Sequence, residues 1–137
     1  MRLLLDTHVV LWWFEDAPDL GASARRHIAD PQNAVFVSAV TFAEVSIKQA
    51  LGKLDAPRLS DDLIAEQGMS SLALSPAHGR RVGELPLHHR DPFDRLLIAQ
   101  AMEEGLTVVT ADGRFADYGV PIVAAGSREP AAGTNRL

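Results

Sequence analysis

Four acidic residues, far apart along the chain, are the side chains best suited to do chemistry together: Asp6, Glu44, Asp94 and Asp112. With no Cys and no His expected beside them, they would form an all-oxygen site, which suits Mg²⁺ or Mn²⁺ better than Zn²⁺. Four like charges at close range repel one another unless a divalent cation is bound. Two such cations, about 3.5–4 Å apart, would activate a water and stabilise the leaving oxygen of a phosphodiester. The set therefore predicts metal-assisted hydrolysis, provided that the fold brings the acids together.

Short apolar segments alternate with helical segments along the chain. The predicted strands are residues 2–5, 34–37, 107–110 and 120–123, with a short edge strand at 69–74. The predicted helices are residues 8–15, 23–29, 60–67, 76–83 and 92–104, and one that is capped by Ser38 or Thr41 and runs to Leu51. This alternation predicts an α/β fold, a three-layer α/β/α architecture with a mostly parallel central sheet.

The predicted fold gathers the four acids at one edge of the sheet. Asp6 directly follows the first strand, and Asp112 lies two residues after the strand at 107–110. Asp94 lies in the first turn of its helix, and Glu44 lies about one turn into the helix after the second strand. In a parallel sheet with crossover helices, the carboxyl ends of the strands and the amino ends of the helices share one edge, where ligands bind.

Two of the acids are also predicted to lie on the apolar faces of their helices. The predicted apolar stripes are Val40, Ala43, Ile47 and Leu51 around Glu44, and Leu97, Ile98 and Ala101 beside Asp94. An ionised carboxylate that faces a core is costly unless it is paired or bound to a metal. Lys48, four residues after Glu44, is the local partner. Helix capping or a turn explains Asp6, Asp94 and Asp112 when each is taken alone, but not Glu44.

The overall composition predicts one globular domain. The chain has 137 residues, 47% of them apolar and 23% charged. We expect the domain at residues 1–123 and a flexible tail at 124–137, where small and polar residues show no period. The absence of Cys excludes disulfides and thiol chemistry and fits a cytoplasmic location, and the longest apolar run, residues 9–14, is too short for a membrane span. With a net charge of −5, bound cations would have to neutralise any nucleic-acid phosphates.

Four segments of the chain resemble a known family. They are residues 3–8 (LLLDTH), residues 38–54 with Glu44, Lys48 and a terminal LGKL, residues 91–101 (DPFDRLLIAQA), and residues 110–115 (TADGRF). The resemblance is to PIN-domain proteins and, more narrowly, to the VapC-type toxins of bacterial toxin–antitoxin pairs. It runs in order over about residues 1–123, and its DPFDR segment is quite specific.

The resemblance implies both a reaction and a set of partners. By resemblance, the four acids hold Mg²⁺ or Mn²⁺ and the protein is an endoribonuclease that hydrolyses RNA phosphodiester bonds as a toxin. The implied partner is a small VapB-like antitoxin that blocks the site, and family members commonly form homodimers. We expect an Arg or Lys of the antitoxin to insert among the acids.

Two arginines and two histidines near the third acid have more than one interpretation. Arg90 and Arg95 are interpreted as contacts to substrate phosphates, and surface ion pairs explain them equally well. His88 and His89 are interpreted either as residues of a solvated loop or, more specifically, as contacts to an RNA phosphate or base.

Three further polar residues are predicted to support the acids. Asp91 lies three residues before Asp94, where it is interpreted as a helix cap or a supporting group rather than a ligand. Thr7 directly follows the first of the four acids, Thr110 lies two residues before the last, and both are also predicted to support them.

Other protein classes also place an Asp after a first strand. A phosphatase of the haloacid dehalogenase type needs a second Asp two positions on, where this chain has His8. A response-regulator receiver needs additional acids around Asp6 and a Lys after a late strand, and neither is present. The alternative that remains is a PIN-like module that binds metal or protein without catalysis. The complete set of acids argues against it, because a decayed site usually loses a ligand.

Overall fold

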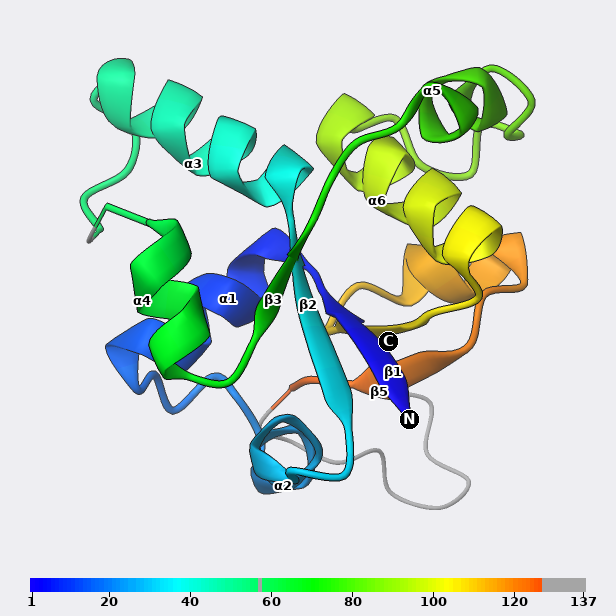
Figure 1. Ribbon diagram of the computed structural model, residues 1–137. Helices are drawn as coiled ribbons and strands as arrows, with labels where there is room; N and C mark the ends of the chain where they lie inside the picture. Colours follow the sequence, from blue (N-terminus) through cyan, green and yellow to red (C-terminus); the bar gives the residue numbers. More distant parts are fainter. Residues whose placement is uncertain (57, 127–137) are drawn as a thin grey trace.

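The computed structural model describes residues 1–56 and 58–126. Its helices are α1 (Thr7–Glu15), α2 (Ala22–Ala29), α3 (Ala39–Ala50), α4 (Asp61–Glu66), α5 (Pro76–Val82) and α6 (Pro92–Glu104), with a 3-10 helix, η1 (Gly113–Tyr118). Its strands are β1 (Arg2–Leu5), β2 (Ala34–Ser38), β3 (Ser70–Leu72), β4 (Thr107–Thr110) and β5 (Ile122–Ala124). The strands form one sheet in the order β3-β2-β1-β4-β5, and each pairing is parallel (Figure 1). The predicted α/β class with a parallel sheet is confirmed.

Helices cover both faces of the sheet, as the central strand shows. Leu3 and Leu5 of β1 belong to a core with residues of α1, α2 and α4. Leu4, which points to the opposite face, belongs to a second core with residues of α6 and η1. All three leucines are fully buried, which explains why β1 is a continuous apolar run rather than an alternating one. Over the described residues, none of the helices has the length and apolar character that a bilayer span requires.

The helix α6 begins and ends at the predicted residues because several local signals agree. The Asp91 side chain accepts the backbone N–H groups of Phe93 and Asp94, at 2.8 and 3.1 Å, and Pro92 takes the first helical position. Gly105 ends the helix in the left-handed conformation, with a φ of 67°. These ends place the first turn of α6 at the carboxyl edge of the sheet.

The predicted apolar stripe of α3 is wrong, although its acid is buried. Ile47 and Leu51 are 46% and 62% exposed, and Ala43 is exposed as well. The buried residues of the helix are Val40, Thr41, Glu44 and Val45. Two of these four, Thr41 and Glu44, are polar. The side of α3 that packs inward is therefore not its most apolar side. A pattern of apolar residues therefore could not locate it.

The carboxyl-terminal boundary of the fold lies beyond the predicted one. The last strand covers Ile122–Ala124 rather than residues 120–123. Ala125 is fully buried, and its carbonyl accepts the Gly21 N–H at 2.9 Å. Leu20 and Gly126 form an antiparallel bridge. Residues 124–126 thus belong to the fold and not to the predicted tail, and the remaining part of that tail, residues 127–137, lies outside the described residues.

The 3-10 helix η1 was not predicted from the sequence. It follows Asp112, whose side chain accepts the Arg114 backbone N–H at 2.9 Å, and it ends at Gly119 with a φ of 80°. Phe115 is fully buried and fixes the segment against the second core. Because Phe115 is the one buried residue of η1, the segment has no repeating apolar pattern from which the sequence could predict a helix.

Candidate metal centre

Asp6 and Asp112 follow the two neighbouring central strands β1 and β4. Asp6 caps α1, and its Oδ1 accepts the Val9 N–H at 2.9 Å. The Thr110 hydroxyl joins the two acids, since Oγ1 donates to Asp6 Oδ2 at 2.5 Å and accepts the Asp112 N–H at 3.0 Å. Burial raises the pKa of Asp6, and the Thr110 hydrogen bond offsets only part of this effect. The register of two paired strands thus sets the position of both acids.

Glu44 reaches the same edge from the second turn of α3. Its side chain is buried, and Lys48 Nζ lies 2.5 Å from Oε2. The hydrogen bond to Glu44 raises the pKa of Lys48. The other oxygen, Oε1, is buried and has no hydrogen-bond partner among the described residues. A buried acceptor without a partner costs roughly 1–3 kcal/mol, so Glu44 is poised to bind one further donor or cation.

Asp94 lies in the first turn of α6, where other acids surround it. Burial is the largest cause that raises its pKa to about 6, followed by repulsion from Asp91. Repulsion from Asp6 and Glu44 also raises it, while the nearby His89 lowers it. Charges that act on one another in this way lie close together, so α6, α3 and β1 direct their acids to one place.

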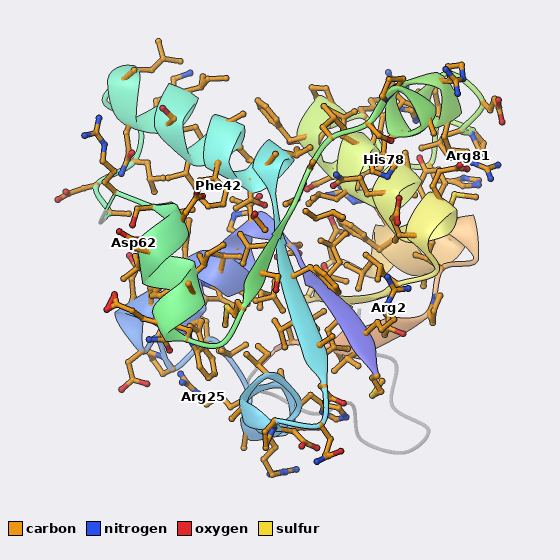
Figure 2. The ribbon with its side chains drawn as sticks, viewed as in Figure 1. Arg2, Arg25, Phe42, Asp62, His78 and Arg81 are labelled. Carbon is orange, nitrogen blue, oxygen red and sulfur yellow. The ribbon has the colours of Figure 1, made fainter. Side chains whose placement is uncertain are left out.

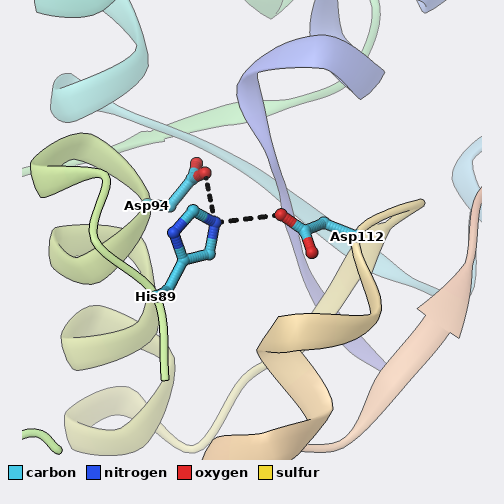
Figure 3. Close-up of side chains that lie close together, drawn as sticks. All are labelled: His89, Asp94 and Asp112. Atoms are coloured by element: carbon cyan, nitrogen blue, oxygen red, sulfur yellow. Dashed lines mark hydrogen bonds and ion pairs between the residues drawn. The ribbon is translucent and has the colours of Figure 1, made fainter. Parts of the chain in front are cut away.

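His89 lies between Asp94 and Asp112 (Figure 3). Its Nε2 is 2.9 Å from Asp94 Oδ2 and 2.9 Å from Asp112 Oδ2. Its Nδ1 accepts the backbone N–H of Asp91 at 3.1 Å. The ring is buried and meets the Phe115 ring edge-on, with the ring centroids 6.0 Å apart. Polar contacts at both ring nitrogens and packing against Phe115 therefore fix the orientation of the His89 ring.

Arg114 covers the outer side of Asp112. Its Nε and one terminal nitrogen donate to the two carboxylate oxygens at 3.0 and 2.9 Å. Burial raises the pKa of Asp112, but the Arg114 hydrogen bonds and the one from His89 outweigh it, so the pKa of Asp112 is lowered. More than half of the Arg114 side chain is exposed. This arginine is accordingly the accessible cation at the rim of the site.

The structure brings the four predicted acids to the predicted edge but adds a residue to them. Within the described part of the chain, the group whose ligand atoms lie within 4.8 Å of one another consists of His89, Asp94 and Asp112. The expectation that no histidine lies beside the acids is therefore wrong. Asp6 and Glu44 flank this group and act on Asp94 through their charge. The assignment of the four acids as ligands remains a prediction.

The solvated-loop interpretation is wrong for His89, and for His88 both interpretations stay predictions. His88 is exposed and packs edge-on against Tyr118, with the ring centroids 5.0 Å apart. His89 is 3% exposed and binds two carboxylates, so it is not a solvated loop residue. Its place two residues before the helix cap Asp91 was the available signal. Nothing in the apolar pattern distinguishes the two.

The structure gives Arg95 a different role from the predicted one. One terminal nitrogen donates to the carbonyls of Pro86 and His89 at 2.9 and 3.3 Å, and the other donates to those of Val82 and Leu85 at 3.1 and 3.2 Å. The guanidinium therefore clamps the loop between α5 and α6 instead of facing a phosphate or forming a surface ion pair. Arg90, in contrast, is exposed, and its role as a phosphate contact stays a prediction.

The residues predicted to support the acids have identifiable contacts. The Thr7 hydroxyl lies 3.1 Å from that of Thr41, and this buried contact joins the first turns of α1 and α3. Asp91 caps α6 and fixes the backbone of Asp94. These contacts hold the helix starts from which the acids project.

The donor set fits a hard divalent cation. Mg²⁺ and Mn²⁺ prefer carboxylate oxygens and retain several waters. Glu44 Oε1 is buried without a partner among the described residues, and Asp94 is surrounded by like charges. A cation at this edge would compensate both features. The arrangement therefore has the chemistry of a metal site that is open to a further ligand.

A parallel α/β sheet with acids at its carboxyl edge defines a class of domain that binds its ligand where the strands end. The sequence matches the PIN domain family over residues 3–121, and the chain belongs to this family. It is similar to Ribonuclease VapC22 of Mycobacterium tuberculosis, with 29% identity over 122 residues, which cover 87% of this chain and 93% of the relative.

Solved structures share the fold. VapBC2 from Rickettsia felis, bound to a DNA fragment from its promoter, has a TM-score of 0.67 at 18% identity, over 91% of this chain and 99% of that one. The DNA-bound VapBC from Salmonella typhimurium has a TM-score of 0.63 at 17% identity, over 90% of this chain and 98% of that one. At these identities the likeness establishes the architecture.

Proposed function

We propose that this protein is a Mg²⁺- or Mn²⁺-dependent endoribonuclease, the toxin of a VapBC-type toxin–antitoxin pair. Membership of the PIN domain family and the similarity to a ribonuclease support the reaction class. The observation that carries the metal dependence is the buried Glu44 Oε1, which has no partner among the described residues and belongs to an acid whose charge acts on Asp94. A cation would satisfy this oxygen and relieve the repulsion that raises the pKa of Asp94.

Each part of the chain has a defined task in this proposal. The proposed ligands are Asp6, Glu44, Asp94 and Asp112. A bound cation would supply an activated water and stabilise the leaving oxygen of the phosphodiester. The chain itself fixes the ligands: the Thr110 hydroxyl holds Asp6 and Asp112, and Lys48 holds one oxygen of Glu44.

Binding of RNA by an acidic chain needs local positive charge. The sequence carries a net charge of −5, so general attraction of RNA is weak without cations at the site. Arg114 lies at the rim with most of its side chain exposed, and the exposed Arg90 is next to His89 in the sequence. We assign phosphate contacts to these two arginines because their side chains are exposed, whereas Arg95 is only partly exposed and its guanidinium donates to loop carbonyls.

The proposed partner is a VapB-like antitoxin. Solved relatives of the same fold are VapBC complexes. An antitoxin Arg or Lys that enters among the acids would replace the cation's charge and block the site, which fits the unpartnered Glu44 oxygen. The proposal includes a homodimer, the state that is common in the family, and a location in the cytoplasm, where RNA and antitoxin are present.

Cleavage of total RNA by the purified protein tests this function. We expect new RNA ends with Mn²⁺ or Mg²⁺, and none when EDTA removes the metal. D6N should abolish cleavage while α1 stays capped, because Asn caps a helix about as well as Asp. E66Q, at an exposed acid of α4, is the matched control and should cleave like wild type.

Three results would contradict the proposal. Cleavage that continues in EDTA would exclude the metal dependence. Full activity of D6N would exclude the assigned site. Metal binding without cleavage of any RNA would favour the alternative, a module that binds without catalysis.

A further inference from the structure

The hydrogen bonds around His89 assign its tautomer. Nδ1 accepts the Asp91 backbone N–H at 3.1 Å, so this nitrogen carries a lone pair and no proton. The remaining proton of the neutral ring is therefore on Nε2, which faces Asp94 Oδ2 and Asp112 Oδ2, each at 2.9 Å. His89 accordingly donates this N–H to Asp112 Oδ2, with Asp94 Oδ2 also 2.9 Å from Nε2.

The position of this donor is imposed by the surrounding structure. Arg95 holds the loop by four carbonyl contacts, one of them to the His89 carbonyl itself. The His89 backbone N–H donates to the Tyr118 hydroxyl at 2.9 Å, and that hydroxyl donates to the Pro86 carbonyl at 2.7 Å. With the ring 3% exposed, neither the loop nor the imidazole has room to turn.

The two acids beside His89 Nε2 come from separate elements. Asp94 belongs to α6, and Asp112 lies in the connection from β4 to η1. Asp112 is also drawn outward by its two hydrogen bonds to Arg114. The His89 N–H is the group that spans the distance between the helix and the strand.

We propose that His89 is a positioning residue, whose Nε2–H donates to Asp112 and whose Nε2 lies against Asp94, so that the two acids keep the separation at which they bind the cation, and that it is not itself a ligand. This inference rests on the proposed function. Binding a metal through Nε2 would move the ring proton to Nδ1, where it would point at the Asp91 N–H. Two donors would then face each other in a buried place.

Binding of Mn²⁺ to the purified protein, followed by calorimetry and by the EPR signal of free Mn²⁺, tests the inference. H89N retains an acceptor near the Asp91 N–H but is too short to reach the acids, so its Kd for Mn²⁺ should rise about 10–100-fold. H89Q places an amide N–H near the position of Nε2, and its Kd should stay within about threefold of wild type. H78N, which changes a buried histidine that contacts Glu104 instead of these acids, is the control and should leave the Kd unchanged.

The outcomes separate this inference from the proposed function. Unchanged or tighter Mn²⁺ binding by H89N would overturn the positioning role and leave the function standing. Weakened binding by H89Q to the level of H89N would also overturn it, because the donor would then not matter. Absence of Mn²⁺ binding by wild type would overturn both.

A measurement on the wild-type protein remains decisive even if the variants fail to fold. The ¹⁵N resonances of the histidine rings distinguish a protonated from a lone-pair nitrogen. We expect His89 Nε2 to carry the proton both before and after saturation with Mg²⁺. Loss of that proton on binding Mg²⁺ would show that His89 is a ligand and would overturn the inference.

Discussion

Two buried histidines lie near opposite ends of α6. Each accepts a backbone N–H at Nδ1 and directs Nε2 to a carboxylate. His78 on α5 (Figure 2) accepts the Ser75 backbone N–H at Nδ1 and directs Nε2 to Glu104 at 2.8 Å. His89 accepts the Asp91 N–H in the same way and directs Nε2 to acids. In both, a backbone amide selects the tautomer and a carboxylate accepts the hydrogen bond from Nε2–H.

The two sites differ in the carboxylates that the histidines meet. His78 meets one, Glu104, whose side chain is 38% exposed and can be solvated. His89 meets two, and the pKa of one of them, Asp94, is raised to about 6 because burial and other acids disfavour its charge. One N–H satisfies a single partly exposed carboxylate but does not compensate several acids that repel one another. The comparison indicates that excess negative charge, rather than the histidine, distinguishes the amino-terminal end of α6 from its carboxyl-terminal end.

Removal of an acid at each end should give the largest contrast. D94N should weaken Mn²⁺ binding by more than about 100-fold, since loss of a ligand exceeds the 10–100-fold typical of groups that support ligands. E104Q should bind Mn²⁺ like wild type. Calorimetric titration measures both, and the thermal midpoint of D94N should not fall, because the change relieves repulsion. Equal binding by D94N and wild type would remove the distinction between the two ends.

Removal of the histidine at the structural end should affect stability instead. H78N takes away the hydrogen bond to Glu104 and leaves space in a buried place, so unfolding in urea should show a loss of about 1–3 kcal/mol. A change in the Kd of H78N for Mn²⁺ together with the stability loss would show that the two ends of α6 are coupled. It would contradict the assignment of separate roles to His78 and His89.

The pH dependence of stability should show the smallest contrast. In the metal-free protein the raised pKa of Asp94 means that the folded state retains a proton which the unfolded chain releases between about pH 4 and 6. Stability should therefore fall as the pH rises through this window, by about 1–2 kcal/mol after allowance for solvent screening. Asp6, whose pKa is also raised, acts in the same sense. Asp112, whose pKa is lowered, acts in the opposite sense but below this window.

The matched variants isolate the contribution of Asp94. Urea unfolding at pH 4, 5 and 6 should show a weaker fall for D94N than for wild type, and E104Q should follow wild type. The same fall in D94N as in wild type would show that Asp94 does not cause it. Saturation with Mg²⁺ should reverse the trend, because the cation binds the ionised acid and gains affinity as the pH rises.

The sequence predicted best what local signals determine. The start and end of α6 follow from Asp91, Pro92 and Gly105, and the edge position of the acids follows from the alternation of strands and helices. Glu44 was recognised as unusual because no capping role explains an acid in the second turn of a helix, and it is indeed buried.

The features that were missed depend on contacts across the fold. The buried side of α3 includes Thr41, whose partner Thr7 is on another helix. The roles of His89 and Arg95 come from carbonyls and carboxylates that only the folded loop brings near. Such polar contacts leave no periodic trace in the sequence, so two neighbouring histidines with opposite environments look alike.

β1 lies at the middle of the sheet, so its two neighbours are synthesised at very different times. Its first neighbour, β2, ends at Ser38, but its second neighbour, β4, ends only at Thr110. The hydrogen bond between Asp6 and Thr110 closes a loop of 104 positions, and contacts of such long range form late. A nascent polypeptide on the ribosome therefore lacks the complete acidic edge until most of it has been translated, and products truncated before β4 could not assemble it.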